Sequence, residues 1–192
     1  MYNLTVKIPP SLQFTDDELF QLCSANKELR IERNSTGQII FMAPSGANSS
    51  RRNSIVNLKV GLWNEQFKLG IVTDSAGGFI LENSAMRAPD VAWFTSEKWN
   101  TFTDEQREKF LKICPDFIVE IRSKSDSLKE LQEKLEEWIE NGCRLAWLID
   151  PYEQNAHIYR SKGDVQIITS FDEELNGEDV LPKFTFSLND LR

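Results

Sequence analysis

The chain has 192 residues, of which 40% are hydrophobic and 27% charged, and its 30 acidic and 22 basic side chains give a net charge of −8. This composition is typical of a folded globular protein with one substantial core and excludes a largely disordered chain. We expect one domain over residues 1–192. The acidic balance argues against a protein that coats nucleic acid through a uniformly basic surface, although a locally basic cleft stays compatible with it.

The apolar and cysteine patterns narrow the classes further. No apolar run is long enough to cross a bilayer and residues 1–7 lack the apolar centre of a secretory signal, so we expect a cytoplasmic protein with no membrane partner. Cys23, Cys114 and Cys143 are far apart and lack the spacing of a zinc or redox site. His157 is the only histidine and lies in an alternating strand pattern, which argues against histidine-based catalysis.

The first half of the chain predicts a helix, a hairpin and a long helix. Thr15 followed by Glu18 before an apolar run predicts a helix that starts with a capping box. Alternating residues 29–33 and 38–42 flank the turn 34–37, a pattern that predicts a β-hairpin. A long amphipathic helix ending at Gly70 is expected next, with an apolar face made of Ile55, Leu58, Leu62 and Phe67.

The second half alternates short strands with helices. Strands are expected at 71–73, 77–81, around Asp90, at 117–121, at 144–150, and in a closing hairpin of 156–160 and 164–169. Residues 96–112 predict one or two short helices, and residues 123–127 would cap a helix over 128–141. A crossover helix between the strands of Glu120 and Leu148 implies one parallel pair in a largely antiparallel sheet. The fold class is therefore α/β or α+β, with a mixed central β-sheet flanked by helices.

Two acidic residues stand inside short apolar strand patterns. Asp90 lies in Pro-Asp-Val-Ala-Trp, and Glu120 is the only acid in Phe-Ile-Val-Glu-Ile. An ionised carboxylate among apolar residues needs a partner, because desolvating its charge costs several kcal/mol. A shared divalent cation would be that partner, since Mg²⁺ and Mn²⁺ favour carboxylate and water oxygens. The pair therefore indicates a metal-dependent site that cleaves phosphodiester bonds.

Such a reaction also needs a cation near the charge that develops on phosphorus. Arg122 lies two positions after Glu120, on the same strand face. Lys134 falls at the edge of the apolar stripe of the following helix, from where a long side chain can reach the sheet. Glu32 is a third acid in a strand pattern and would complete the metal shell or orient the water.

Each of these residues also has a purely structural interpretation. Asp90 follows a proline and could cap a turn, and Glu120 could form an ion pair with Arg122 or Lys134. Lys134 alone is more often a solvated flank lysine, and Glu32 alone a surface strand residue. The two acids in similar apolar contexts favour the functional interpretation when they are taken together.

The motifs resemble the Uma-type restriction endonuclease family of the PD-(D/E)XK nuclease superfamily. The similar segments are residues 30–44, 87–93, 114–127 and 141–151. The resemblance implies a restriction-endonuclease-like fold, with Asp90 and Glu120 as metal ligands and Glu32 as a further acidic site residue. The superfamily pattern has a lysine two positions after the second acid, where this chain has Arg122. The Uma-type pattern places that lysine in the next helix, at the position of Lys134.

These observations lead to three functional hypotheses. The first is a Mg²⁺- or Mn²⁺-dependent DNA endonuclease in which Asp90 and Glu120 bind metal, Glu32 assists, and Lys134 positions or activates the attacking water. The second is a non-catalytic, dimeric interaction module that keeps the nuclease fold. The third is a metal-dependent hydrolase with a substrate other than nucleic acid. Apolar strands near the C-terminus offer edges for pairing, so we expect a homodimer.

Overall fold

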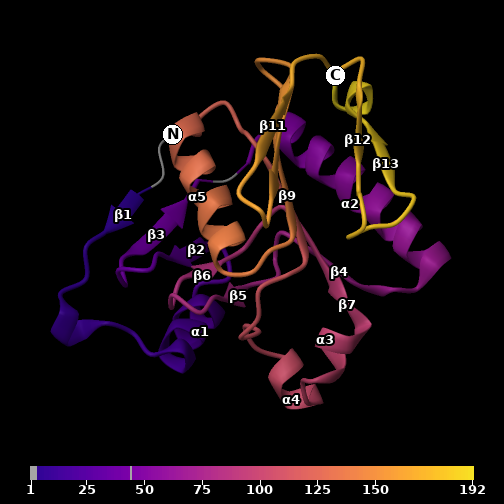
Figure 1. The fold of residues 1–192 in the computed structure, drawn as a ribbon. Helices are drawn as coiled ribbons and strands as arrows, with labels where there is room; N and C mark the ends of the chain where they lie inside the picture. Colours follow the sequence, from indigo (N-terminus) through magenta and orange to yellow (C-terminus); the bar gives the residue numbers. More distant parts are fainter. Residues whose placement is uncertain (1–3, 44) are drawn as a thin grey trace.

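The computed structural model describes residues 4–43 and 45–192. Residues 1–3 of the N-terminal segment and Pro44 of the similar segment 30–44 lie outside this part. The described chain forms three β-sheets with helices around them (Figure 1). Of the helices in this part, none combines the length and the apolar character that a membrane span requires.

The central sheet has six strands in the order β11-β10-β9-β8-β7-β4. Its strands in chain order are β4 (Gly70–Asp74), β7 (Val91–Thr95), β8 (Phe117–Ile121), β9 (Leu145–Asp150), β10 (Asn155–Arg160) and β11 (Val165–Ile168). β8 and β9 are parallel and are joined by helix α5 (Leu128–Glu140), whereas the other neighbours are antiparallel. The expected mixed sheet with one parallel pair is therefore confirmed.

The N-terminal part forms a second sheet of five strands in the order β1-β3-β2-β6-β5. Its strands are β1 (Leu4–Val6), β2 (Arg30–Arg33), β3 (Ile39–Met42), β5 (Phe79–Ile80) and β6 (Met86–Arg87). The expected hairpin is confirmed, because β2 and β3 pair antiparallel around the turn. The short 3-10 helix η1 (Pro10–Leu12) and helix α1 (Asp16–Ala25) lie between β1 and β2, and α1 begins with the expected capping box of Thr15 and Glu18.

The remaining elements lie around the central sheet. Helix α2 (Ala47–Phe67) precedes β4, and the short helices α3 (Ser96–Asn100) and α4 (Asp104–Arg107) follow β7. A C-terminal hairpin of β12 (Glu174–Asn176) and β13 (Thr185–Ser187) precedes the 3-10 helix η2 (Leu188–Leu191). Helices α5 and α2 flank the central sheet from opposite sides (Figure 1). This C-terminal hairpin is an addition to the elements expected from the sequence.

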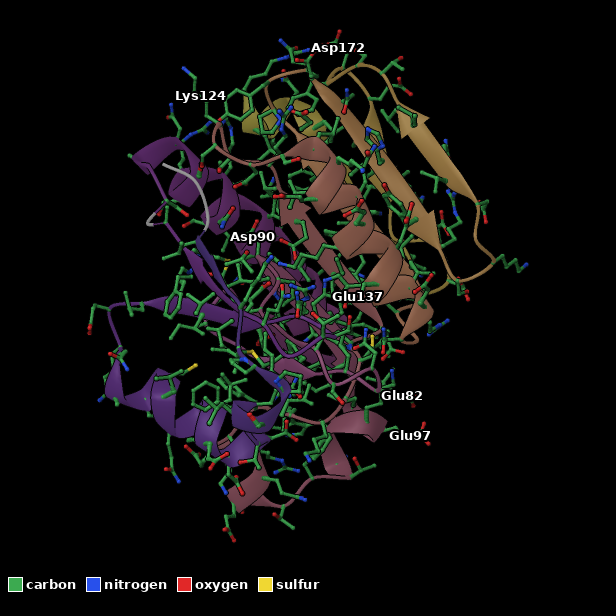
Figure 2. All side chains as sticks on the ribbon, turned by 90° about the vertical axis from the view of Figure 1, so that its left-hand side faces the viewer. Glu82, Asp90, Glu97, Lys124, Glu137 and Asp172 are labelled. Carbon is green, nitrogen blue, oxygen red and sulfur yellow. The ribbon has the colours of Figure 1, made fainter. Side chains whose placement is uncertain are left out.

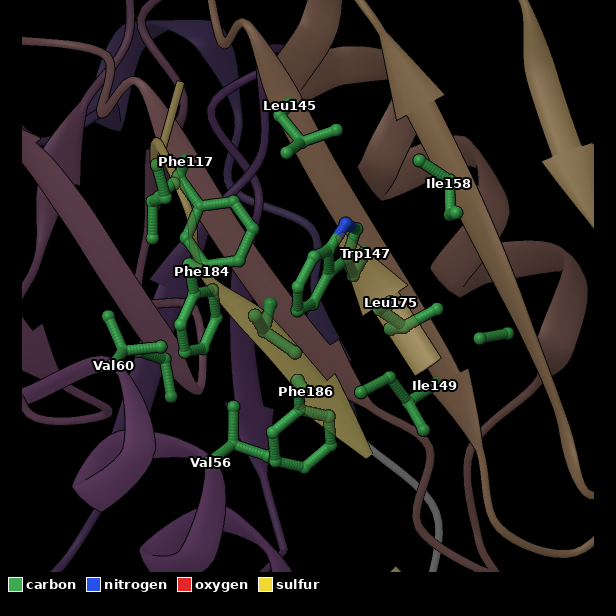
Figure 3. Close-up of a cluster of buried hydrophobic side chains, with 14 of the residues drawn as sticks. Val56, Val60, Phe117, Leu145, Trp147, Ile149, Ile158, Leu175, Phe184 and Phe186 are labelled. Atoms are coloured by element: carbon green, nitrogen blue, oxygen red, sulfur yellow. The ribbon is translucent and has the colours of Figure 1, made fainter. Parts of the chain in front are cut away.

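Alternation along the central strands produces a core on each face. One face packs Trp147 edge-on against Phe117, with ring centroids 4.8 Å apart, and parallel to Phe184 of the C-terminal segment (Figure 3). The same cluster takes Val56 and Val60 from α2. The opposite face packs its alternate residues under α5. Glu120 belongs to that second face because it alternates with Val119 and Ile121 of the first.

The apolar face expected for α2 is confirmed for Ile55 and Phe67, which pack against the core, and is wrong for Leu58 and Leu62. Leu58 and Leu62 are 59% and 58% exposed, whereas Val56, Val60 and Trp63 are buried against the sheet. The indole of Trp63 donates a hydrogen bond to the carbonyl oxygen of Pro182, which fixes the inward face. The helix ends before Gly70. Lys68 forms the left-handed C-cap, and Gly70 is instead the first residue of β4.

Candidate active site

The pairing of β7 with β8 brings the two predicted acids together. Val91 lies opposite Val119 and Ala92 opposite Ile118, so one step further along this register places Asp90 opposite Glu120. Residues directly opposite on adjacent strands are close neighbours. Both acids therefore lie on the α5 side of the central sheet, at the C-terminal end of strand β8.

Hydrogen bonds from two elements hold Asp90 in place. Its Oδ2 accepts a 2.8 Å hydrogen bond from the backbone N–H of Ile121, directly after Glu120. Its Oδ1 accepts a 2.6 Å hydrogen bond from the Asn53 side chain on α2. Figure 2 shows Asp90 toward the middle of the molecule, whereas Lys124 and Asp172 lie near its periphery. Strand β8 and helix α2 thus both hold the Asp90 carboxylate in place.

Lys134 lies between two acids. Its Nζ is 2.8 Å from Glu120 Oε1 and 2.8 Å from Glu32 Oε1. The side chains of Lys134, Glu120 and Glu32 are only 12%, 7% and 3% exposed. The position of Lys134 follows from the geometry of α5. Leu135 and Trp138 form the buried face of this helix, and Lys134 lies at the border of that face. The lysine from the helix therefore reaches the acids as expected.

Glu32 is engaged on both of its carboxylate oxygens. Oε1 accepts hydrogen bonds from Lys134 Nζ at 2.8 Å and from the backbone N–H of Ala88 at 3.0 Å. Oε2 accepts one from Arg87 at 3.0 Å, and Arg87 also contacts Glu137 at 2.6 Å. Strand β2 of the N-terminal sheet is thereby connected to α5 beside the central sheet.

The buried charges shift one another's pKa values. Burial raises the pKa of Glu120 to about 7, with Asp90 and Glu32 adding to the rise and Lys134 opposing it. Burial also raises the pKa of Asp90, against the hydrogen bond from Ile121 and the charges of Lys134 and Arg30. Burial acts to raise the pKa of Glu32 as well, but Lys134 and Arg87 outweigh it and bring this pKa to about 2.

Lys134 responds in the opposite sense. Burial alone lowers the pKa of an amine, but the carboxylates of Glu120 and Glu32 outweigh burial and raise the pKa of Lys134. The amine therefore stays protonated at neutral pH. Lys134 is a fixed cation beside Glu120 rather than a proton acceptor.

Asp90 and Glu120 fit a hard divalent cation. Two carboxylates with water in the remaining positions are a common Mg²⁺ ligand set. Glu120 Oε1 is buried with Lys134 Nζ 2.8 Å away, and burial raises the pKa of both acids, so a cation bound between them would stabilise their charged forms. Within residues 4–43 and 45–192, no group of three or more His, Cys, Asp or Glu side chains is arranged to hold a metal ion. The role of Glu32 as a third ligand stays a prediction.

Arg122 does not join this cluster, although its spacing from Glu120 made it a candidate. Strand β8 ends at Ile121, and the Arg122 guanidinium forms a 2.6 Å ion pair with the fully buried Asp150 at the end of β9. Conversely, Arg87 and Asn53 contact the acids and were not expected. Arg87 stands three positions before Asp90, the one local signal that could have indicated it.

The fold is that of a nuclease-like protein. A crystal structure described as "a putative nuclease belonging to DUF820 from Anabaena variabilis ATCC 29413" has the same fold, with a TM-score of 0.77 and 20% sequence identity over 93% of this chain and 97% of that one. A family model described as "Uma2: Putative restriction endonuclease" matches residues 16–189, so the chain belongs to the Uma2 family. A search of curated proteins finds no match. The family expected from the motifs is confirmed, and it supports a nuclease.

Proposed function

We propose that the protein is a divalent-metal-dependent DNA endonuclease that hydrolyses phosphodiester bonds. One observation carries this proposal. Lys134 Nζ lies 2.8 Å from Glu120 Oε1, at the end of β8 where Glu120 lies opposite Asp90. Two acids and a cation at one edge supply the charges that phosphoryl chemistry needs. Membership of the Uma2 family supports the same conclusion.

Each residue has a distinct role in this proposal. Asp90 and Glu120 would hold Mg²⁺ or Mn²⁺, which when bound would contact a phosphate oxygen and lower the pKa of water. Lys134 is kept protonated by its carboxylate neighbours, so it positions the attacking water and stabilises negative charge on the phosphate. Glu32 holds the amine in place, because Arg87 and Ala88 fix its own carboxylate.

Cleavage of plasmid DNA with Mg²⁺ or Mn²⁺ tests the proposal. Asp90→Ala and Lys134→Ala are expected to lower the cleavage rate by at least about a hundredfold, the usual effect of removing one charge-stabilising group. Lys129→Ala is the matched control, because Lys129 lies on the same helix with its side chain 84% exposed. Equal cleavage by all four proteins would contradict the assigned roles.

A second candidate function is a non-catalytic interaction module. It is favoured by the engagement of Lys134 with both Glu120 and Glu32, which is also the geometry of a structural ion-pair network. Titration calorimetry with Mn²⁺ separates the two functions. A nuclease site should bind Mn²⁺ and lose it in Asp90→Ala, whereas a module without a metal site should release no such heat.

We further propose that the protein acts as a homodimer in the cytoplasm, since cleavage of both DNA strands commonly uses two paired sites. Edge strand β11 supports pairing, because Val165 and Ile167 are 47% and 54% exposed along it. Sedimentation velocity of the wild type and of Ile167→Lys tests the assembly. A monomeric wild type would contradict it.

A further inference from the structure

An open groove of about 610 Å³ lies beside Asp90. Its walls come from β2, from the end of β3, from the N-terminal half of α2 and from the end of β4. Most of its lining residues are polar or charged, among them Arg30, Ser50, Asn53 and Asn57, and no aromatic residue of the described chain lines it. A groove without aromatic faces does not suit stacking of bases, and its amides and guanidinium suit a phosphate backbone.

Arg30 is the cation of this groove. Its guanidinium donates a 3.2 Å hydrogen bond to the carbonyl oxygen of Ser75 and forms no ion pair with a carboxylate of the described residues. The neighbouring arginines differ, because Arg87 is bound by Glu32 and Glu137, and Arg122 by Asp150. A guanidinium has five N–H donors, so Arg30 keeps most of them for an anion.

Asn53 connects the groove to the acids. Its amide N–H donates to Asp90, while its Oδ1 is buried without a hydrogen-bond partner. The side-chain amide has two N–H donors, of which Asp90 takes one, and the other suits a backbone phosphate because phosphate oxygens only accept hydrogen bonds. Asn57 lies one helical turn later and lines the same groove. Both amides therefore line the groove beside Asp90.

We infer that this groove is the subsite that binds the DNA backbone next to the cleaved bond, with Arg30 as its phosphate-binding residue and Asn53 and Asn57 as its flanking polar contacts. The inference rests on the proposed nuclease function and names the part of the protein that holds its substrate. Glu28 and Asp74 are exposed and also line the groove, so its attraction for phosphate is local to Arg30 rather than spread over a basic surface.

Binding of a fluorescein-labelled DNA duplex, followed by anisotropy, tests the subsite. Ca²⁺ replaces Mg²⁺ in this assay, because it is also held by oxygen ligands. Arg30→Gln is expected to weaken binding about tenfold, which is about 1.4 kcal/mol. It should also lower the slope of log K against log salt concentration by about 0.9, the loss of one phosphate contact. Arg144→Gln is the matched control, since Arg144 pairs with Asp179 outside the groove and should bind like the wild type.

Two further measurements make every outcome decisive. If Arg30→Gln does not fold, as judged by circular dichroism, Asn57→Asp decides, because its negative charge in the groove should weaken binding about tenfold and unchanged binding would overturn the subsite. Mg²⁺-dependent cleavage by the wild type is followed in parallel. A wild type that neither binds nor cleaves DNA overturns the proposed function and the subsite together. Cleavage by the wild type with unchanged affinity in Arg30→Gln overturns the subsite alone.

Discussion

Replacement of Lys134 by methionine removes the one cation, among the residues that the structure describes, that contacts both Glu120 and Glu32. Each contact is 2.8 Å long, and an ion pair at this distance has a Coulomb energy of roughly 6 kcal/mol at an effective dielectric constant of about 20. Desolvation of the amine offsets much of this attraction. Because the remaining carboxylates stay buried, the net loss in the free energy of unfolding should be about 3 to 5 kcal/mol at pH 8.

The loss in the free energy of unfolding caused by Lys134→Met should become smaller as the pH is lowered. The pKa of Glu120 is raised from 4.5 to about 7, so its protonation stabilises the folded state fully below pH 4.5, and this stabilisation is lost as the pH rises through about 7. Lys134 opposes that rise, and its removal therefore raises the pKa of Glu120 further. Glu120 is therefore protonated at higher pH in Lys134→Met than in the wild type. The difference in the free energy of unfolding between the two proteins should narrow by about 1 kcal/mol between pH 8 and pH 6.

Urea denaturation at both pH values measures these quantities. Lys129→Met is the control on the same helix, and its exposed pair with Glu133 at 3.5 Å should contribute less than about 0.5 kcal/mol. The double variant Lys134→Met/Glu120→Gln should recover part of the loss, because position 120 no longer carries a buried charge without its lysine. A loss below about 1 kcal/mol for Lys134→Met at pH 8, or equal to that of the control, would refute this account of the cluster.

Two other predictions concern the core and its pH dependence. Trp147→Ala should lower the free energy of unfolding by about 3 to 5 kcal/mol, because it empties the space between Phe117 and Phe184. Thermal denaturation measures this loss, and a much smaller change would show that the space is not tightly packed. Burial lowers the pKa of His157, so the folded protein binds its proton less well than the unfolded chain and loses stability as the pH falls below about 6.5. His157→Gln should remove this part of the acid sensitivity in urea denaturation at pH 5 and pH 7, and an unchanged difference would exclude it.

Local sequence signals predicted the elements that depend on near neighbours. The capping box of Thr15 and Glu18 and the hairpin turn 34–37 were predictable, because each depends only on residues a few positions apart in the sequence. The parallel pair of β8 and β9 was also predictable, since a single helix separates two apolar strands. The position of Lys134 followed from its angle to the buried stripe of α5.

Tertiary contacts decided what the sequence could not predict. Helix α2 has apolar residues on two faces, and the choice of Val56, Val60 and Trp63 over Leu58 and Leu62 depends on the C-terminal segment that covers them. That segment contains strands of three residues, which are too short for a strong alternating pattern.

The cation beside Glu120 is determined by where β8 ends. On a longer strand, a residue two positions after Glu120 would point to the same face and meet the acids directly. Here the last strand residue is Ile121, and the next residue, Arg122, turns to the buried Asp150 on β9. The place beside Glu120 is then filled from α5, whose Lys134 reaches down to the sheet edge. Strand length and helix position therefore act together, because a lysine at position 122, one residue beyond the end of β8, would pair with Asp150 and would not reach Glu120.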